Sequence, residues 1–223
     1  MVERLTMVRI NVCLIAVLMI AAVAFAADTF DSPNSPNSAK PLDVPFLSQF
    51  WDATGPIPAS QRNSNCAPAA VEMAAAFAQG RQARIENIIE LNKLMGRKDP
   101  VKGAPTKHRE VRDAARKLYN LPIEYKHMTL DEALKEVAAG GPVVVGLIYK
   151  HLTTRWDQNC TGGHTLVLVG ADDKSVIVND PDDKSADHKG KSLHYDRAEF
   201  EKAMKDFGNA CLVGFRKASG KSE

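Results

Sequence analysis

The chain has 223 residues, of which 44% are hydrophobic and 25% are charged, a composition that supports one folded domain with a sizeable core. Its 29 lysines and arginines nearly balance its 27 aspartates and glutamates, so the formal net charge is only +2. This balance gives no electrostatic reason to expect a nucleic-acid partner or a partner at a membrane surface.

The N-terminal segment has the pattern of a secretory signal peptide. An uncharged apolar stretch begins at Ile10 after two arginines, and Ala24 and Ala26 supply the small residues that suit signal peptidase. We therefore expect a signal peptide over residues 1–27 and export of a bacterial protein to the periplasm or the medium. The apolar run of residues 10–27 also approaches the roughly 20 residues that cross a bilayer, so an uncleaved membrane anchor is the alternative.

The remaining chain divides into a linker, a domain and a tail. Residues 28–40 are rich in Ser, Pro, Asn and Asp and cannot bury enough apolar surface to fold alone, so they predict a flexible linker. The folded domain is expected over residues 41–217 and a polar tail over residues 218–223.

The first half of the domain is predicted to be mainly helical. Val44–Leu47 favours a short entering strand, and an alanine-rich run that ends before Gly80 favours a helix with Cys66 at its entrance. Apolar residues at helical intervals indicate further helices, the last of them capped by Thr129. The predicted helices cover residues 68–79, 85–94, 106–118 and 130–138.

The second half is predicted to be mainly strand. Residues 143–149 are dense in β-branched side chains, which is typical of a buried strand. Residues 165–169 and 176–178 flank a turn-forming segment and should pair antiparallel. A helix over residues 197–207 and a strand over residues 210–215 close the domain. Helices first and a mainly antiparallel sheet later predict the α+β class.

Three cysteines would remain after removal of the signal peptide: Cys66, Cys160 and Cys211. An exported protein can form disulfides, and an odd number leaves one thiol over. Cys160 and Cys211 could pair, which would leave Cys66 free, whereas the alternative is that all three thiols are reduced.

The predicted hairpin brings a histidine and an aspartate together. A turn centred near Asp172 would place His164 and Asp180 opposite each other, with their Cβ atoms about 5 Å apart, so that the carboxylate can orient the imidazole. Cys66 at a helix N-terminus is the candidate nucleophile. A free cysteine has a pKa of about 8.5, but helix amides and a neighbouring imidazolium favour the thiolate, so Cys66 and His164 are expected to form an ion pair.

Metal binding is the competing interpretation of the same region. Cys160 and His164, together with His188 or His194, have a spacing conceivable for a metal site, but no complete zinc pattern is present. The charged loop over residues 180–191 could bind calcium, although a solvated loop explains it as well. We expect neither a metal nor a cofactor.

Five motifs in order along residues 42–215 carry a resemblance to papain-fold cysteine peptidases related to the double-glycine leader peptidases of bacteriocin exporters, often called C39-like peptidases. The motifs are Val44-Pro45-Phe46-Leu47-Ser48-Gln49, Asn65-Cys66-Ala67-Pro68-Ala69-Ala70-Val71-Glu72-Met73, Gly140-Gly141-Pro142-Val143-Val144-Val145-Gly146, Gly163-His164-Thr165-Leu166-Val167-Leu168-Val169-Gly170 and Val178-Asn179-Asp180-Pro181.

The resemblance implies a role for each matching residue. Cys66 would be the nucleophile, His164 the general base and then acid, and Asp180 the orienting carboxylate. Gln49 would contribute to the oxyanion hole, with Gln61 as its rival because it lies nearer to Cys66 in the sequence.

The resemblance also implies a peptide or protein substrate and a papain-like fold. Ala67 departs from the glycine that usually follows the nucleophile in this family, which narrows the accessible backbone conformations. Leader peptidases are normally fused to a cytoplasmic transporter, so the predicted signal peptide favours a less specific exported peptidase. An acyltransferase or transamidase that uses the same thiol, or a catalytically silent binding module, are the alternatives.

Overall fold

The computed structural model describes residues 40–52, 55–56, 64–97, 106–184 and 189–217. All of them belong to one compact unit, Ser35–Glu223. The predicted signal peptide, nearly all of the predicted linker and the predicted tail lie outside the described residues. Among the described residues, no helix is long and apolar enough to cross a membrane.

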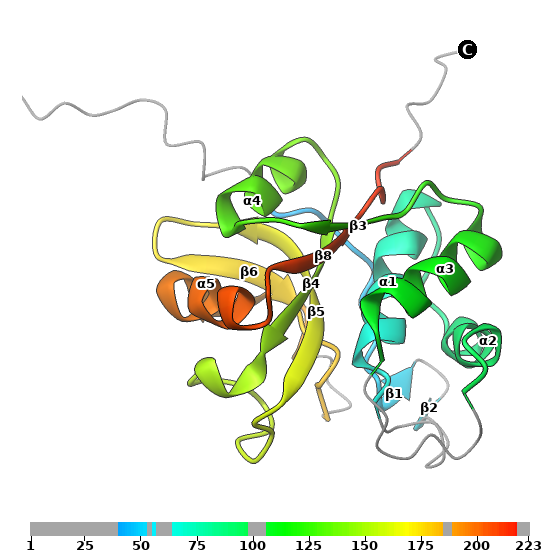
Figure 1. Ribbon diagram of the computed structural model, residues 1–223, viewed down its shortest axis with the longest axis horizontal. Coiled ribbons are helices and arrows are strands. Elements are labelled where there is room, and N and C mark those ends of the chain that lie inside the picture. The colour runs from blue at the N-terminus through cyan, green and yellow to red at the C-terminus, as the bar shows by residue number, and fades with distance from the viewer. Residues whose placement is uncertain (1–39, 53–54, 57–63, 98–105, 185–188, 218–223) are drawn as a thin grey trace, which may run out of the picture. The chain divides into compact units, whose positions relative to one another are not determined.

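Three helices form the first half of the domain and pack on one another (Figure 1): α1 (Cys66–Ala78), α2 (Ile85–Leu94) and α3 (His108–Tyr119). Alanines on α1 allow its neighbours to approach closely, and Val71 and Met73 are fully buried between them. The helix ends as predicted, because Gly80 adopts a positive φ of 64° that residues with a Cβ rarely take.

An antiparallel sheet of six strands forms the second half, in the order β3-β8-β4-β5-β6-β7. Its strands are β3 (Glu124–His127), β4 (Val143–Ile148), β5 (Gly163–Ala171), β6 (Ser175–Asn179), β7 (Leu193–Asp196) and β8 (Ala210–Val213). A 3-10 turn, η2 (Tyr149–His151), follows β4, and a separate pair joins β1 (Trp51–Asp52) to β2 (Gly55–Pro56).

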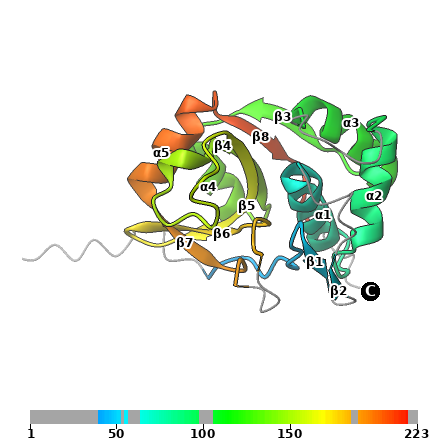
Figure 2. The ribbon, with the colours of Figure 1, turned by 90° about the horizontal axis from the view of Figure 1, so that it is seen from below.

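Helices cover both faces of the six-stranded sheet. Alternate residues of β4 point to opposite sides: Val144 joins the core under α1, α2 and α3, whereas Val143 and Val145 join the core under α4 (Leu130–Ala138) and α5 (Arg197–Asp206). Figures 1 and 2 show α1–α3 on one side of the sheet and α4 and α5 on the other. The α+β prediction is confirmed.

The predicted secondary structure differs from the observed one at Val44–Leu47 and at four strands that were not predicted, β1, β2, β3 and β7. Val44–Leu47 is not a regular strand, because its segment makes one backbone bond to β5, from Leu42 N to Val169 O (2.9 Å), and no continuous ladder. Strands β3 and β7 were not predicted. Both are four residues long and lie at the edges of the sheet, where exposed residues interrupt the apolar pattern.

The β5–β6 hairpin forms, but its register is shifted from the predicted one. A bulge between Leu168 and Gly170 pairs Leu168 with Val178, which sets Asp180 two positions away from His164 along the strand direction. Because side chains alternate with a period of two, this shift keeps both side chains on the same face of the sheet.

Candidate active site

Cys66 is the first residue of α1 and is half-buried, whereas the rest of the helix is buried. The N-cap residue, Asn65, makes no side-chain capping bond, and the first turn contains no acidic residue. No acidic side chain in the first turn neutralises the partial positive charge of the helix N-terminus, so this charge acts on the Cys66 thiol. Pro68 is accommodated because the amides of the first turn have no partner within the helix.

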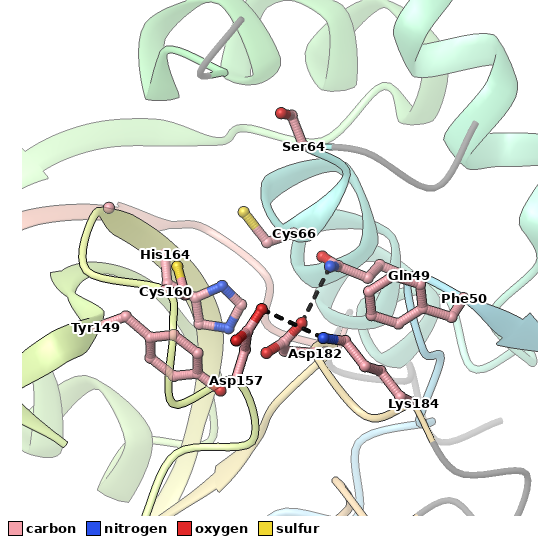
Figure 3. Close-up of a pocket in the computed structure, with 11 residues that line it drawn as sticks. Gln49, Phe50, Ser64, Cys66, Tyr149, Asp157, Cys160, His164, Asp182 and Lys184 are labelled. Atoms are coloured by element: carbon pink, nitrogen blue, oxygen red, sulfur yellow. Dashed lines mark hydrogen bonds and ion pairs between the residues drawn. The ribbon is translucent and has the colours of Figure 1, made fainter. Parts of the chain in front are cut away.

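His164 lies on β5 and is held by Asp180, which follows β6. The imidazole Nε2 is 2.7 Å from Asp180 Oδ1, and the exposed fractions of the two side chains are 5% and 0%. With Nε2 engaged by the carboxylate, Nδ1 is the nitrogen left for Cys66. Figure 3 shows Cys66 at the end of α1, across the pocket from the His164 ring.

Asp180 is fully buried and accepts further hydrogen bonds. The hydroxyls of Tyr149 and Tyr195 donate to Oδ2 at 3.0 and 2.7 Å, and the backbone amide of Asp182 donates to Oδ1 at 2.9 Å. The Tyr149 ring also packs on His164, with ring centroids 4.2 Å apart. These donors replace the water that a buried carboxylate loses.

The electrostatics of the three groups favour an ion pair. Burial opposes the Cys66 thiolate, but the neighbouring His164 outweighs it and lowers the pKa of Cys66. Burial likewise opposes the imidazolium, but Asp180, and then Cys66, raise the pKa of His164 well above its ordinary value. The pKa of Asp180 is lowered, because His164 and Tyr195 outweigh the effect of burial.

A pocket of about 300 Å³ opens beside these groups. Gln49 lines it and is itself buried, with an exposed fraction of 8%. Its Nε2 donates to Asp182 Oδ1 at 3.3 Å. The structure thus brings Gln49, Cys66 and His164 to one pocket, with Asp180 behind the imidazole. Gln61, the rival for the Gln49 role, lies outside the described residues.

The possible disulfide between Cys160 and Cys211 is not formed, and both thiols are free. Cys211 lies on β8 opposite Val145, whereas Cys160 belongs to the loop before Gly163, which pairs with Ile148. Strand β4 lies between β8, which carries Cys211, and β5, which follows the loop of Cys160.

Among the described residues suggested for a metal site, Cys160 and His164 line the same pocket but do not belong to a metal-binding cluster. Within the described ranges, no group of three or more His, Cys, Asp or Glu side chains could hold a metal ion. His194 instead contacts Asp172 at 3.1 Å, and His188 is outside those ranges. In the charged loop, Asp180 and Asp183 accept protein hydrogen bonds, the latter from Gly190 N.

Tyr149, Tyr195 and Asp182 belong to the site but were not predicted from the sequence. The sequence places Tyr149 at the end of the predicted strand over residues 143–149, whereas in the structure it lies just beyond β4, in η2. Asp182 follows Asp180 by two residues, a spacing that could have drawn attention to it. Tyr195 had no such signal, because β7 was not predicted.

A helix-borne cysteine facing a buried histidine–aspartate pair on an antiparallel sheet is the arrangement of papain-like cysteine peptidases. The model of the Peptidase_C39 like family matches residues 41–212, and the chain belongs to this family. It is therefore a cysteine peptidase. No curated protein matches the chain.

Solved structures share the fold. A C39-like peptidase from Bacillus anthracis is 18% identical with a TM-score of 0.56, over 78% of this chain and 97% of that one. A double-glycine motif protease from an AMS/PCAT transporter, in complex with its leader peptide, is 18% identical with a TM-score of 0.50, over 79% of this chain and 94% of that one. These likenesses bear out the papain-like α+β fold.

Proposed function

We propose that the protein is an exported hydrolase that cleaves a peptide or amide bond through a thioacyl intermediate on Cys66. The observation that carries the proposal is the buried His164–Asp180 pair, joined at 2.7 Å, which faces a half-buried cysteine at the start of α1. This arrangement supports a thiolate at neutral pH, which is the form of cysteine that attacks carbonyl groups.

The proposed reaction begins when Cys66 Sγ attacks the substrate carbonyl carbon, which forms a C–S bond and moves an electron pair onto the oxygen. The Gln49 amide and the Cys66 backbone N–H would stabilise that oxyanion, each donor contributing about 3 kcal/mol. Collapse of the intermediate breaks the C–N bond, and His164 gives its proton to the leaving amine. Water, deprotonated by His164, then attacks the thioester and releases the acid and Cys66.

Asp180 would keep the imidazole in the productive tautomer and stabilise the imidazolium. A peptide or protein is the proposed substrate, since the pocket is open beside Cys66 and a protease of similar fold binds a leader peptide. Ala67 is buried in the hydrophobic core and is not among the residues that line that pocket. No cofactor is needed for these steps.

The proposed location is outside the cytoplasm, with residues 1–27 as a cleaved signal peptide. Fractionation of producing cells followed by N-terminal sequencing of the protein tests this. Export with an N-terminus at residue 27 or 28 is expected, whereas retention of the segment in a membrane fraction would identify it as an anchor.

The test of the chemistry compares the exported protein with Cys66→Ala on a peptide library, followed by mass spectrometry. Cleavage only by the wild-type protein is expected, and equal cleavage by both would overturn the mechanism. Iodoacetamide should label Cys66 but spare Cys211, whose burial raises its pKa to about 12, so Cys211 serves as an internal control. Addition of a primary amine separates the alternatives: an acyl–amine product in place of the acid would identify a transferase.

A further inference from the structure

Residues 180–183, the segment that follows β6, contact both His164 and the Ser48–Gln49 segment. Asp180 at its start holds His164, as described above. Further along, the carbonyl of Pro181 accepts a hydrogen bond from Gln49 N at 2.8 Å, and the carbonyl of Asp183 accepts one from Ser48 Oγ at 2.6 Å. The backbone of Gln49 is therefore attached to the same short segment that carries the histidine's carboxylate.

The side chain of Asp182 extends this attachment to the Gln49 amide. Asp182 has an exposed fraction of 6% and lines the pocket that contains Cys66 and His164. Its Oδ1 accepts a hydrogen bond from Gln49 Nε2 at 3.3 Å, and Figure 3 shows this contact beside Cys66. Its own backbone amide donates to Asp180, which limits its freedom to move.

We propose that Asp182 is a positioning residue that orients the Gln49 amide so that its nitrogen, and not its oxygen, serves the oxyanion hole. This inference rests on the proposed role of Gln49. A carboxyl oxygen next to an amide attracts the NH₂ end, which carries two hydrogens. One hydrogen is used by Asp182, and the second remains for the oxygen of the tetrahedral intermediate.

The environment of Asp182 suits this role in either protonation state. Burial raises the pKa of Asp182 to about 6, so its carboxyl can take up a proton when negative charge develops nearby. Oδ1 accepts the bond from Gln49 in both states. In the described part of the chain, Asp182 Oδ2 and Gln49 Oε1 have no hydrogen-bond partner, so the single bond between the two side chains is what orients the amide.

The test is a double-mutant cycle on a peptide identified in the library, with Asp182→Ala, Gln49→Ala and the double variant. Loss of one oxyanion donor lowers kcat by about 10²–10³-fold, so a misoriented donor should cost about 10–100-fold in kcat with little change in KM. The double variant should match Gln49→Ala within about twofold, because Asp182 acts only through Gln49. Asp182→Asn keeps an acceptor oxygen and should retain most of the activity.

Alkylation of Cys66 by iodoacetamide supplies the second readout, because it forms no oxyanion. Its limiting rate at alkaline pH, where Cys66 is fully ionised and the charge interaction between Asp182 and His164 no longer matters, should be the same in wild type, Asp182→Ala and the matched surface variant Asp173→Ala, which changes an exposed turn residue. Slower alkylation of Cys66 at alkaline pH in Asp182→Ala would overturn the inference. So would a loss of kcat on changing Asp182 to alanine that is the same in the wild-type protein and in Gln49→Ala.

The two proposals fail in different ways. Full activity of Asp182→Ala beside an impaired Gln49→Ala would overturn the positioning role and leave the proposed function intact. Full activity of Gln49→Ala would remove the oxyanion role of Gln49 and this inference with it. Activity in Cys66→Ala would remove the proposed mechanism itself.

Discussion

Asp180 shows how a charge is kept in a protein core. Its carboxylate contacts no solvent, yet it accepts bonds from the imidazole of His164, from two tyrosine hydroxyls and from a backbone amide. Burial, and then Asp180, raise the pKa values of Tyr149 and Tyr195, so both hydroxyls stay protonated and remain donors. The carboxylate that raises the pKa of His164 therefore depends on two tyrosines distant in sequence.

Tyr195→Phe tests this dependence. A hydrogen bond to a charged group contributes about 1.5–3 kcal/mol, and its loss makes the Asp180 carboxylate less favourable. We expect the pKa of His164, followed by NMR of the imidazole, to fall relative to wild type. Tyr125→Phe is the control, because Tyr125 contacts the His127 ring and lies outside the site. An unchanged His164 titration in Tyr195→Phe would contradict the role assigned to the hydroxyl.

The segment after β6 depends on a close approach at Gly190. Asp180 N donates to Gly190 O at 2.8 Å, and Gly190 N donates to Asp183 Oδ2 at 2.8 Å. A Cβ at Gly190 would collide with the carbonyl oxygen of Asp180 and would lie 2.9 Å from the Phe46 ring. A methyl group here would therefore displace the backbone that carries Asp180.

Gly190→Ala is expected to destabilise the fold by about 1–3 kcal/mol and to slow Cys66 alkylation, as measured by denaturant unfolding and iodoacetamide labelling. Gly162→Ala is the matched control, because no atom lies within 4 Å of the added Cβ, and it should change stability by less than about 0.5 kcal/mol. Equal stability of the two variants would argue against the close approach.

A capping box stabilises the start of α4. Thr129 accepts from Glu132 N, and the Glu132 carboxylate accepts from Thr129 N at 2.8 Å. Thr129→Ala should cost about 1 kcal/mol in thermal unfolding without altering Cys66 labelling, since no residue of α4 lines the pocket of Cys66. The exposed Thr154→Ala is the control, and a Thr129→Ala protein as stable as that control would contradict the cap.

The elements that could be predicted from the sequence are those whose bounds depend on residues close to them in the chain. The bounds of α2 and α4 agree with the prediction, because apolar periodicity and the Thr129 cap are local signals. The hairpin was predicted, but its register was not, since the bulge between Leu168 and Gly170 depends on packing with distant residues such as Pro41, which would lie 3.1 Å from a Cβ at Gly170. Tyr195 depends on long-range contacts of the unpredicted strand β7, so no pattern near it indicated its role, whereas the only local signal for Asp182 was its spacing from Asp180.

At the scale of the whole molecule, a buried histidine links the helical half to the sheet. His108 starts α3, lies against the Phe207 ring at 5.6 Å, and faces Gly146 of β4, where a Cβ would meet it. Burial lowers the pKa of His108 to about 4. The folded protein therefore holds this imidazole neutral at pH values where the unfolded chain protonates it.

The sign of the resulting pH dependence follows from this difference. Between about pH 4 and pH 6.5 the unfolded state binds more protons at His108, so its contribution to stability falls on acidification, by about 3 kcal/mol in total. His108→Gln should show a shallower loss of unfolding free energy than wild type between pH 6.5 and pH 4, measured by urea denaturation. Parallel curves for the two proteins would show that His108 does not titrate in this way.

In the proposed mechanism, His164 holds Cys66 as a thiolate. The most direct measurement is the rate of Cys66 alkylation by iodoacetamide as a function of pH, in wild type and in His164→Asn, which can still donate a hydrogen bond to Asp180. We predict that wild type reacts with an apparent pKa below the roughly 8.5 of a free thiol and that His164→Asn reacts with a higher one. Coincident profiles, or a wild-type profile like that of a free thiol, would contradict the account.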